Sequence, residues 1–86
     1  ELAGVIEAVG PGGDDHLIGH KVAVFPLIPC RDCAMCEIGE YAQCLNYNYL
    51  GSRCDGGFAE LVRVPEWNLV PVPDGVSLEE AAMVEP

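Results

Sequence analysis

Four of the five cysteines of the chain lie in one short stretch, "PCRDCAMCEIGEYAQC", at residues 29–44. Their spacing is Cys30-x2-Cys33-x2-Cys36-x7-Cys44. Cysteines three residues apart are poorly placed to form several disulfides at once, and an odd number of cysteines cannot all pair. Tetrahedral metal binding fits the spacing better, because one turn of chain can supply three thiolates and a short loop can return the fourth. Zinc and iron–sulfur centres both accept four thiolates, so the ligand type leaves the metal open.

A site of four cysteines fills every coordination position of a tetrahedral ion. No position remains for a substrate, so such a site stabilises a loop and performs no catalysis. The alternative is a reduced, metal-free loop, which this spacing disfavours. Cys54 stands apart in "GSRCDGGF", with no histidine near it in sequence. We therefore expect Cys54 to be a free thiol in a turn and not a nucleophile.

The elements that must position these cysteines are predicted to be mainly β. Apolar and polar residues alternate in several short segments, each bounded by glycine or proline. We therefore expect strands at residues 4–10, 20–25, 58–65 and 67–73. The prolines in the last of these suit an edge strand or the exit from a strand. Ser77, followed by Glu79 and Glu80, predicts the start of a helix. Short strands separated by turns predict a small barrel or sandwich.

Composition and charge restrict the kinds of partner. Four basic residues against fourteen acidic ones give a formal net charge of -10, which repels phosphate backbones and anionic lipid surfaces. We therefore expect no nucleic-acid partner and no membrane partner. No apolar run approaches the ~20 residues of a membrane-spanning helix, and no signal peptide is visible. The 86 residues suit one domain whose ends look cut, so we expect a piece of a longer protein.

The chain also resembles a known family over nearly its whole length. The segments that carry the resemblance are "ELAGVIEAVG", "GHKVAVFPLIPC", the four cysteines, "GSRCDGGFAELVRVP" and "EEAAMVEP". Together they resemble the GroES-like catalytic domain of the medium-chain zinc-dependent alcohol dehydrogenases. "NYNYLGSRCDGGFAE" and the closing "EP" most resemble the polyol branch, that of the sorbitol dehydrogenases and, more closely, the galactitol-1-phosphate 5-dehydrogenases. The resemblance implies a GroES-like barrel with an inserted four-cysteine lobe at residues 30–44 and the start of a C-terminal helix.

The resemblance assigns roles by position. The four cysteines match the structural zinc lobe of the family. Glu1 matches the glutamate of its Gly-His-Glu motif, and Glu85 matches the position at which polyol dehydrogenases place a glutamate. Both are therefore candidate ligands or close neighbours of a catalytic zinc. Arg31 departs from a glycine common after the first cysteine, and His20 departs from an aspartate usual at that strand start. Neither is a ligand position, so the metal assignment is unaffected.

The activity implied by the resemblance is oxidation of a secondary alcohol or polyol, with a sugar-alcohol phosphate among the candidates, by hydride transfer to NAD or NADP. A Rossmann domain absent from these 86 residues would hold the cofactor. "VGPGGDD" lacks the G-x-G-x-x-G pattern, so we expect no cofactor-binding residue here. A small-molecule alcohol as substrate, a homo-oligomeric state and a cytoplasmic location are further implications.

A second hypothesis stays open beside the dehydrogenase. It is a free-standing metal–thiolate module that binds partners or transfers electrons without catalysis. Metal content separates the two hypotheses, because a zinc site is colourless whereas an iron–thiolate site absorbs visible light.

Overall fold

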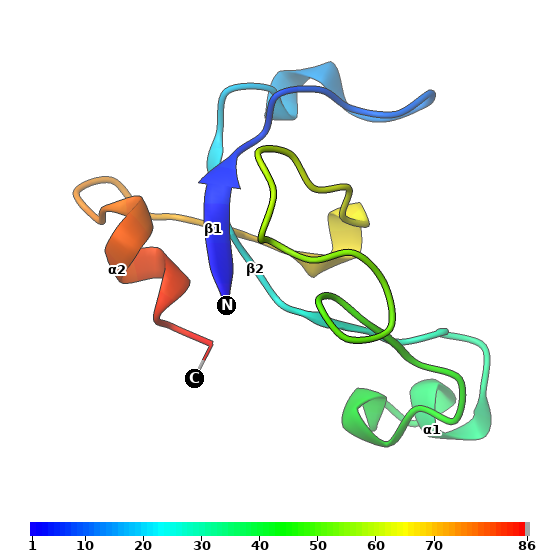
Figure 1. Ribbon diagram of the computed structural model, residues 1–86. Helices are drawn as coiled ribbons and strands as arrows, with labels where there is room; N and C mark the ends of the chain where they lie inside the picture. The colour runs from blue at the N-terminus through cyan, green and yellow to red at the C-terminus, as the bar shows by residue number, and fades with distance from the viewer. Residues whose placement is uncertain (86) are drawn as a thin grey trace. The chain divides into compact units, whose positions relative to one another are not determined.

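The computed structural model describes residues 1–85, which divide into two compact units. The first unit combines Glu1–Phe25 with the chain from Leu69 onward, and the second unit is Pro26–Asn68. Both units are built on antiparallel strands with short helices, so the mainly β fold class is confirmed (Figure 1). Among residues 1–85, no helix has the length and apolar character needed to cross a membrane.

The first unit contains a three-stranded antiparallel sheet in the order β1-β2-β5. Its strands are β1 (Leu2–Val5), β2 (Lys21–Val24) and β5 (Leu69–Pro71). Alternation along β2 buries Val22 and Val24 and leaves Lys21 exposed, which is the pattern of a strand packed on one face. β5 lies at an edge of the sheet as predicted, where the missing N–H of Pro71 interrupts no further ladder.

The glycine-rich segment after β1 forms a turn, as predicted. The Gly13 N–H donates to the Gly10 carbonyl over 2.9 Å, and η1 (Asp15–Leu17) follows. β1 is shorter at its C-terminal end than the strand expected at residues 4–10, although the Ile6 N–H still donates to the His20 carbonyl over 3.0 Å. The chain therefore returns to β2 through a compact loop.

α2 (Leu78–Ala82) begins where the sequence predicted and packs against β1 and β2. The Glu80 N–H donates to the Ser77 Oγ over 3.1 Å, and the Ser77 N–H donates to the Glu80 carboxylate over 3.0 Å. This capping box satisfies two amide donors that the helix itself cannot pair. Hydrogen bonds to the Glu80 carboxylate, first from the Ser77 backbone N–H and then from the Ser77 side chain, hold the pKa of the Glu80 carboxyl below its ordinary value.

Replacing Ser77 by alanine is expected to lower the free energy of unfolding by about 1 kcal/mol at neutral pH. Because the pKa of Glu80 is lowered in the folded state, its stabilising contribution is complete above the ordinary value of 4.5. That contribution is lost as the pH falls through the folded-state pKa. The cost of Ser77→Ala should therefore shrink in acid. Denaturant unfolding at about pH 7 and about pH 3 measures this, with the exposed Ser52→Ala as control. An equal cost at both pH values would contradict the part played by the Glu80 charge.

The second unit holds the cysteine-rich loop. Its elements are β3 (Leu27–Ile28), α1 (Ala34–Glu37), η2 (Tyr41–Gln43), β4 (Asn48–Tyr49) and η3 (Glu66–Asn68). β3 and β4 pair as antiparallel strands, which brings the two ends of the loop together. The buried apolar residues of this unit are three cysteines, Leu50 and two prolines, Pro26 and Pro29. A core this small needs a staple, which is the role expected of a metal ion.

The strand expected at residues 58–65 is not formed, so this expectation was wrong for the described structure. Among residues 1–85, no backbone N–H or C=O of residues 57–64 pairs with another backbone group. Phe58 and Leu61 are exposed. Alternation of side chains suits a segment to a strand, but a strand forms only against a neighbour that completes its hydrogen bonds. No such neighbour lies within the described residues.

Candidate metal centre

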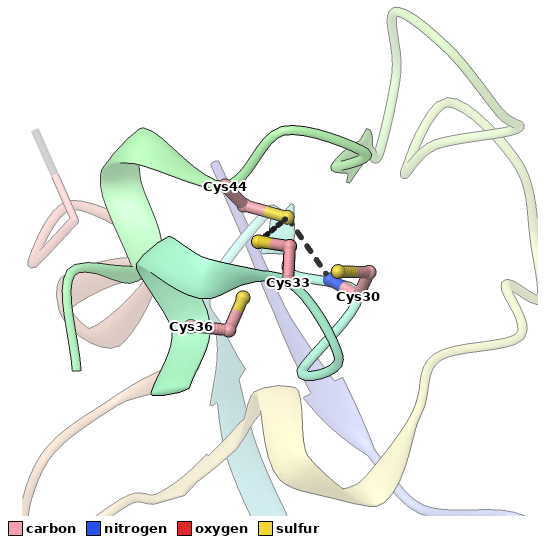
Figure 2. A group of neighbouring side chains, drawn as sticks. All are labelled: Cys30, Cys33, Cys36 and Cys44. Carbon is pink, nitrogen blue, oxygen red and sulfur yellow. Dashed lines mark hydrogen bonds between the residues drawn. The ribbon is translucent and has the colours of Figure 1, made fainter. Parts of the chain in front are cut away.

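Figure 2 shows the four predicted ligands side by side on the loop between β3 and β4. Cys30 follows β3, Cys33 caps the N-terminus of α1, Cys36 lies within α1, and Cys44 ends η2. The four sulfur atoms all lie within 4.8 Å of one another. Among residues 1–85 they are the only group of three or more metal-ligating side chains that come together in this way. The structure thus assembles the set that the spacing predicted.

These separations fit a single tetrahedral ion. Zn–S bonds of ~2.3 Å place the sulfurs of such a site about 3.8 Å apart. The sulfurs of Cys33 and Cys44 lie 3.9 Å apart, so the loop is close to the required geometry. An iron–sulfur cluster spreads its thiolates around several metal ions and would hold them further apart. All five cysteines are free, so no disulfide competes for the ligands.

Backbone amides point at every sulfur of the group. The donors are Cys30 to Cys44 (3.2 Å), Arg31 to Cys36 (3.3 Å), Asp32 to Cys30 (3.4 Å), Asn46 to Cys44 (3.4 Å) and Leu45 to Cys33 (3.5 Å). An N–H donor favours the thiolate over the thiol, and the thiolate is the form that binds metal. The backbone of the loop therefore supports four negative ligands around one point.

The four thiols do not ionise alike without a metal. Donation by the Leu45 amide lowers the pKa of the Cys33 thiol to about 6. Burial raises the pKa of the Cys36 thiol to about 11, although the Arg31 amide opposes this. Each successive deprotonation of the four thiols is less favourable than the one before, because the thiolates repel one another. A bound cation offsets that repulsion, which explains why such a group suits zinc.

The first turn of the loop depends on an unusual backbone conformation at Arg31. Its φ is 60°, in the left-handed region, and it is the only non-glycine residue of the described chain with a positive φ. This conformation costs an ordinary residue about 1 kcal/mol, whereas glycine adopts it freely. Arg31 thus stands, in place of the glycine common in the resembled family, at a position where glycine would adopt the required backbone conformation without strain.

The other predicted site residues are not assembled. Glu1 precedes β1 and Glu85 follows α2, and both side chains are exposed. Neither belongs to a group of metal-ligating side chains within residues 1–85, so their roles stay predictions. Cys54 is half-buried and free, and its thiol donates to the Tyr49 carbonyl over 3.7 Å. It lies in a turn outside the four-cysteine group, as predicted.

Several side chains around the cysteines have no signal in the sequence. Met35 and Tyr41 pack against the buried sulfurs. Trp67, far along the chain, contacts Tyr41 edge to face with ring centroids 5.2 Å apart. The spacing of residues in the sequence cannot predict this contact of Trp67, because Trp67 and Tyr41 come together only through the tertiary fold. The unusual residue at position 31 was the one local hint that side chains beyond the ligands matter.

Residues 1–74 match the family described as the alcohol dehydrogenase GroES-like domain. The chain belongs to this family. The fold and the resemblance inferred from the motifs are therefore confirmed, and the four-cysteine group fits the zinc site that the resemblance implied.

Members of this alcohol dehydrogenase family align along the chain. Galactitol 1-phosphate 5-dehydrogenase of Escherichia coli K12 is 45% identical over 86 residues, all of this chain and 25% of the relative. Sorbitol dehydrogenase of Bacillus subtilis 168 is 37% identical over 87 aligned residues, again 25% of the relative. A crystal structure of an alcohol dehydrogenase from Escherichia coli CFT073, complexed with NADH, superimposes with a TM-score of 0.89 at 40% identity over 94% of this chain and 24% of that one. The chain thus spans about a quarter of the length of its relatives.

Proposed function

We propose that the chain is part of the catalytic domain of a longer zinc-dependent oxidoreductase, which oxidises a secondary alcohol or polyol by hydride transfer to NAD or NADP. The observation that carries the proposal is the closed set of four thiolates in a chain that aligns throughout with polyol dehydrogenases. The 45% identity with galactitol 1-phosphate 5-dehydrogenase favours a sugar-alcohol phosphate as substrate. The family resemblance supports a homo-oligomer in the cytoplasm.

The four cysteines would hold a structural zinc in this enzyme. With every ligand a thiolate, no coordination position is left for substrate. The four cysteines and their zinc would stabilise the conformation of residues 30–44, where the protein has little apolar core of its own. This separates the metal site found in the structure from the chemistry of the reaction.

Glu1 and Glu85 are proposed to act at a second, catalytic zinc. Such an ion supplies a Lewis acid for the alcohol oxygen. The described residues do not complete a ligand set around either carboxylate, so the remaining ligands must come from other parts of the longer protein. The nicotinamide cofactor is likewise assigned to a Rossmann domain outside these residues. NADH bound to the related alcohol dehydrogenase supports the cofactor class.

Metal content and gene context test the proposal. The purified chain should contain one zinc and be colourless, whereas a visible iron–thiolate band would favour an electron-transfer module. Extension of the gene in both directions should show a Gly-His pair directly before Glu1 and a G-x-G-x-x-G motif after Glu85. A longer gene lacking both features would contradict the dehydrogenase.

The 86-residue chain alone is expected to have no dehydrogenase activity. It lacks a cofactor domain and the ligands needed to complete a catalytic zinc site. NADH formation from galactitol 1-phosphate and sorbitol measures this, with the extended gene product as the positive control. Turnover by the short chain would overturn the assignment of cofactor and ligands to other parts of the protein.

A further inference from the structure

The turn formed by η3 contacts the metal-binding loop near its start. Asn68, the last residue of η3, is only 1% exposed. Its amide Nδ2 donates to the Leu27 carbonyl over 2.6 Å. Leu27 begins β3, the strand that leads directly to Cys30. The hydrogen bond therefore fixes η3 against the strand that delivers the first ligand.

The neighbouring Trp67 contacts the loop at two further points. Its ring meets Tyr41 edge to face at an interplanar angle of 68°, and the Arg31 guanidinium lies 5.9 Å from its centroid. We call these three residues, Arg31, Tyr41 and Trp67, the aromatic clamp. Edge-to-face ring pairs and cations over an indole are both attractive. The clamp thus joins residues at both ends of the ligand set to one distant turn.

Each clamp residue on the loop is tied through its backbone to a ligand. The Arg31 N–H donates to the Cys36 sulfur over 3.3 Å. The Tyr41 carbonyl accepts from the Cys44 N–H over 3.0 Å. Contact with Trp67 therefore restrains the peptide groups that orient two of the four sulfurs. It also offsets the strain of the left-handed backbone at Arg31, since the side chain gains a partner in that conformation.

We infer that Trp67 and Arg31 are positioning residues for the four-cysteine metal site, and that the aromatic clamp raises its zinc affinity by holding the loop in the ligating geometry before the ion binds. Ordering a loop is part of the free energy cost of binding, so an ordered loop binds more tightly. The coupling is reciprocal: zinc must stabilise the clamp by the same factor as the clamp favours zinc. The inference goes beyond the proposed function, since it does not depend on the dehydrogenase reaction.

Zinc affinity of the folded chain tests the inference, measured by competition with a chromophoric chelator. Trp67→Leu should lower the affinity roughly tenfold, the size expected for loss of one ring pair and one cation–π contact. Trp67→Phe keeps an aromatic face and should recover part of the loss. Phe58→Leu is the matched control, because Phe58 is a fully exposed aromatic residue of the same unit. Its affinity should equal that of the unaltered chain.

A double-mutant cycle separates positioning from a general loss of stability. Arg31→Ala should weaken zinc binding, and combining it with Trp67→Leu should cost less than the sum of the two single changes, because Arg31 acts partly through Trp67. Additive effects of the two changes would overturn the inference. Equal zinc affinity for Trp67→Leu and Phe58→Leu would also overturn it.

Trp67 is the only tryptophan of the chain, so its fluorescence gives a second readout without any substitution in the clamp. Zinc should change this fluorescence with saturation at one ion per chain, and the change should be absent in Cys36→Ser. If Trp67→Leu does not fold, this titration still tests whether zinc binding is coupled to the aromatic clamp. A fluorescence signal unaffected by stoichiometric zinc would overturn the coupling between clamp and site.

Discussion

Replacing Cys36 by serine is expected to lower zinc affinity by more than ~100-fold. Loss of a side chain that only contacts a metal ligand, without binding the metal itself, lowers the affinity by less than this. Cys36 is buried within the group, and its sulfur accepts from the Arg31 amide. A neutral hydroxyl is a poor ligand beside three thiolates, and the shorter side chain leaves the fourth position unfilled. Chelator competition measures the loss of affinity, and amide exchange measures the loosening of residues 30–44.

Cys54→Ser is the matched control for this experiment. Cys54 is also a free thiol, but it lies outside the four-cysteine group. The control should bind zinc as the unaltered chain does. In both variants the strands of the first unit should remain, because their pairing and the burial of Val22 and Val24 involve no metal ligand. Amide exchange in residues 30–44 that does not change on metal removal would contradict the structural role.

In the longer enzyme, Glu85→Ala is expected to slow the chemical step by ~10–100-fold, and by more if the carboxylate binds the catalytic zinc directly. A carboxylate at or near the ion balances its charge and fixes the orientation of its neighbours. The substitution should also make the catalytic zinc easier to chelate. One zinc per chain should stay bound, because Glu85 is not part of the four-cysteine group.

Single-turnover hydride transfer and zinc stoichiometry together measure the effect of Glu85→Ala. Glu7→Ala is a suitable control, since Glu7 is an exposed glutamate with no predicted role in metal binding. It should leave both quantities unchanged. Unaltered hydride transfer with two tightly held zinc ions in Glu85→Ala would show that Glu85 is a surface carboxylate with no role at the catalytic zinc. The main sequence argument for the polyol branch would then be lost.

Local patterns in the sequence predicted the features that depend on near neighbours. The spacing of Cys30, Cys33, Cys36 and Cys44 predicted the metal site, because few residues separate the ligands and the loop between them is short. Ser77 predicted the start of α2 for the same reason, since its capping box spans three residues. The prolines near the end of the chain predicted an edge strand or a strand exit, and β5 lies at an edge.

The expected strand at residues 58–65 shows where local patterns fail. The alternation there describes the side chains, whereas a strand is defined by the backbone groups of its neighbour. Within residues 1–85 no neighbour completes those hydrogen bonds. The pairing of a strand is a tertiary property, so its sequence alone cannot decide it.

The sequence by itself determined the four-cysteine group, the family and the mainly β character of the chain. The tertiary structure alone decided what surrounds the ligands. Asn68 reaches Leu27 across 41 positions, and Trp67 meets both Arg31 and Tyr41. Such contacts have no fixed spacing, because they depend on where the chain returns after an irregular segment. Metal ligation within one loop follows from a few neighbouring torsion angles, whereas the support of that loop follows from the whole path of the chain through its unit.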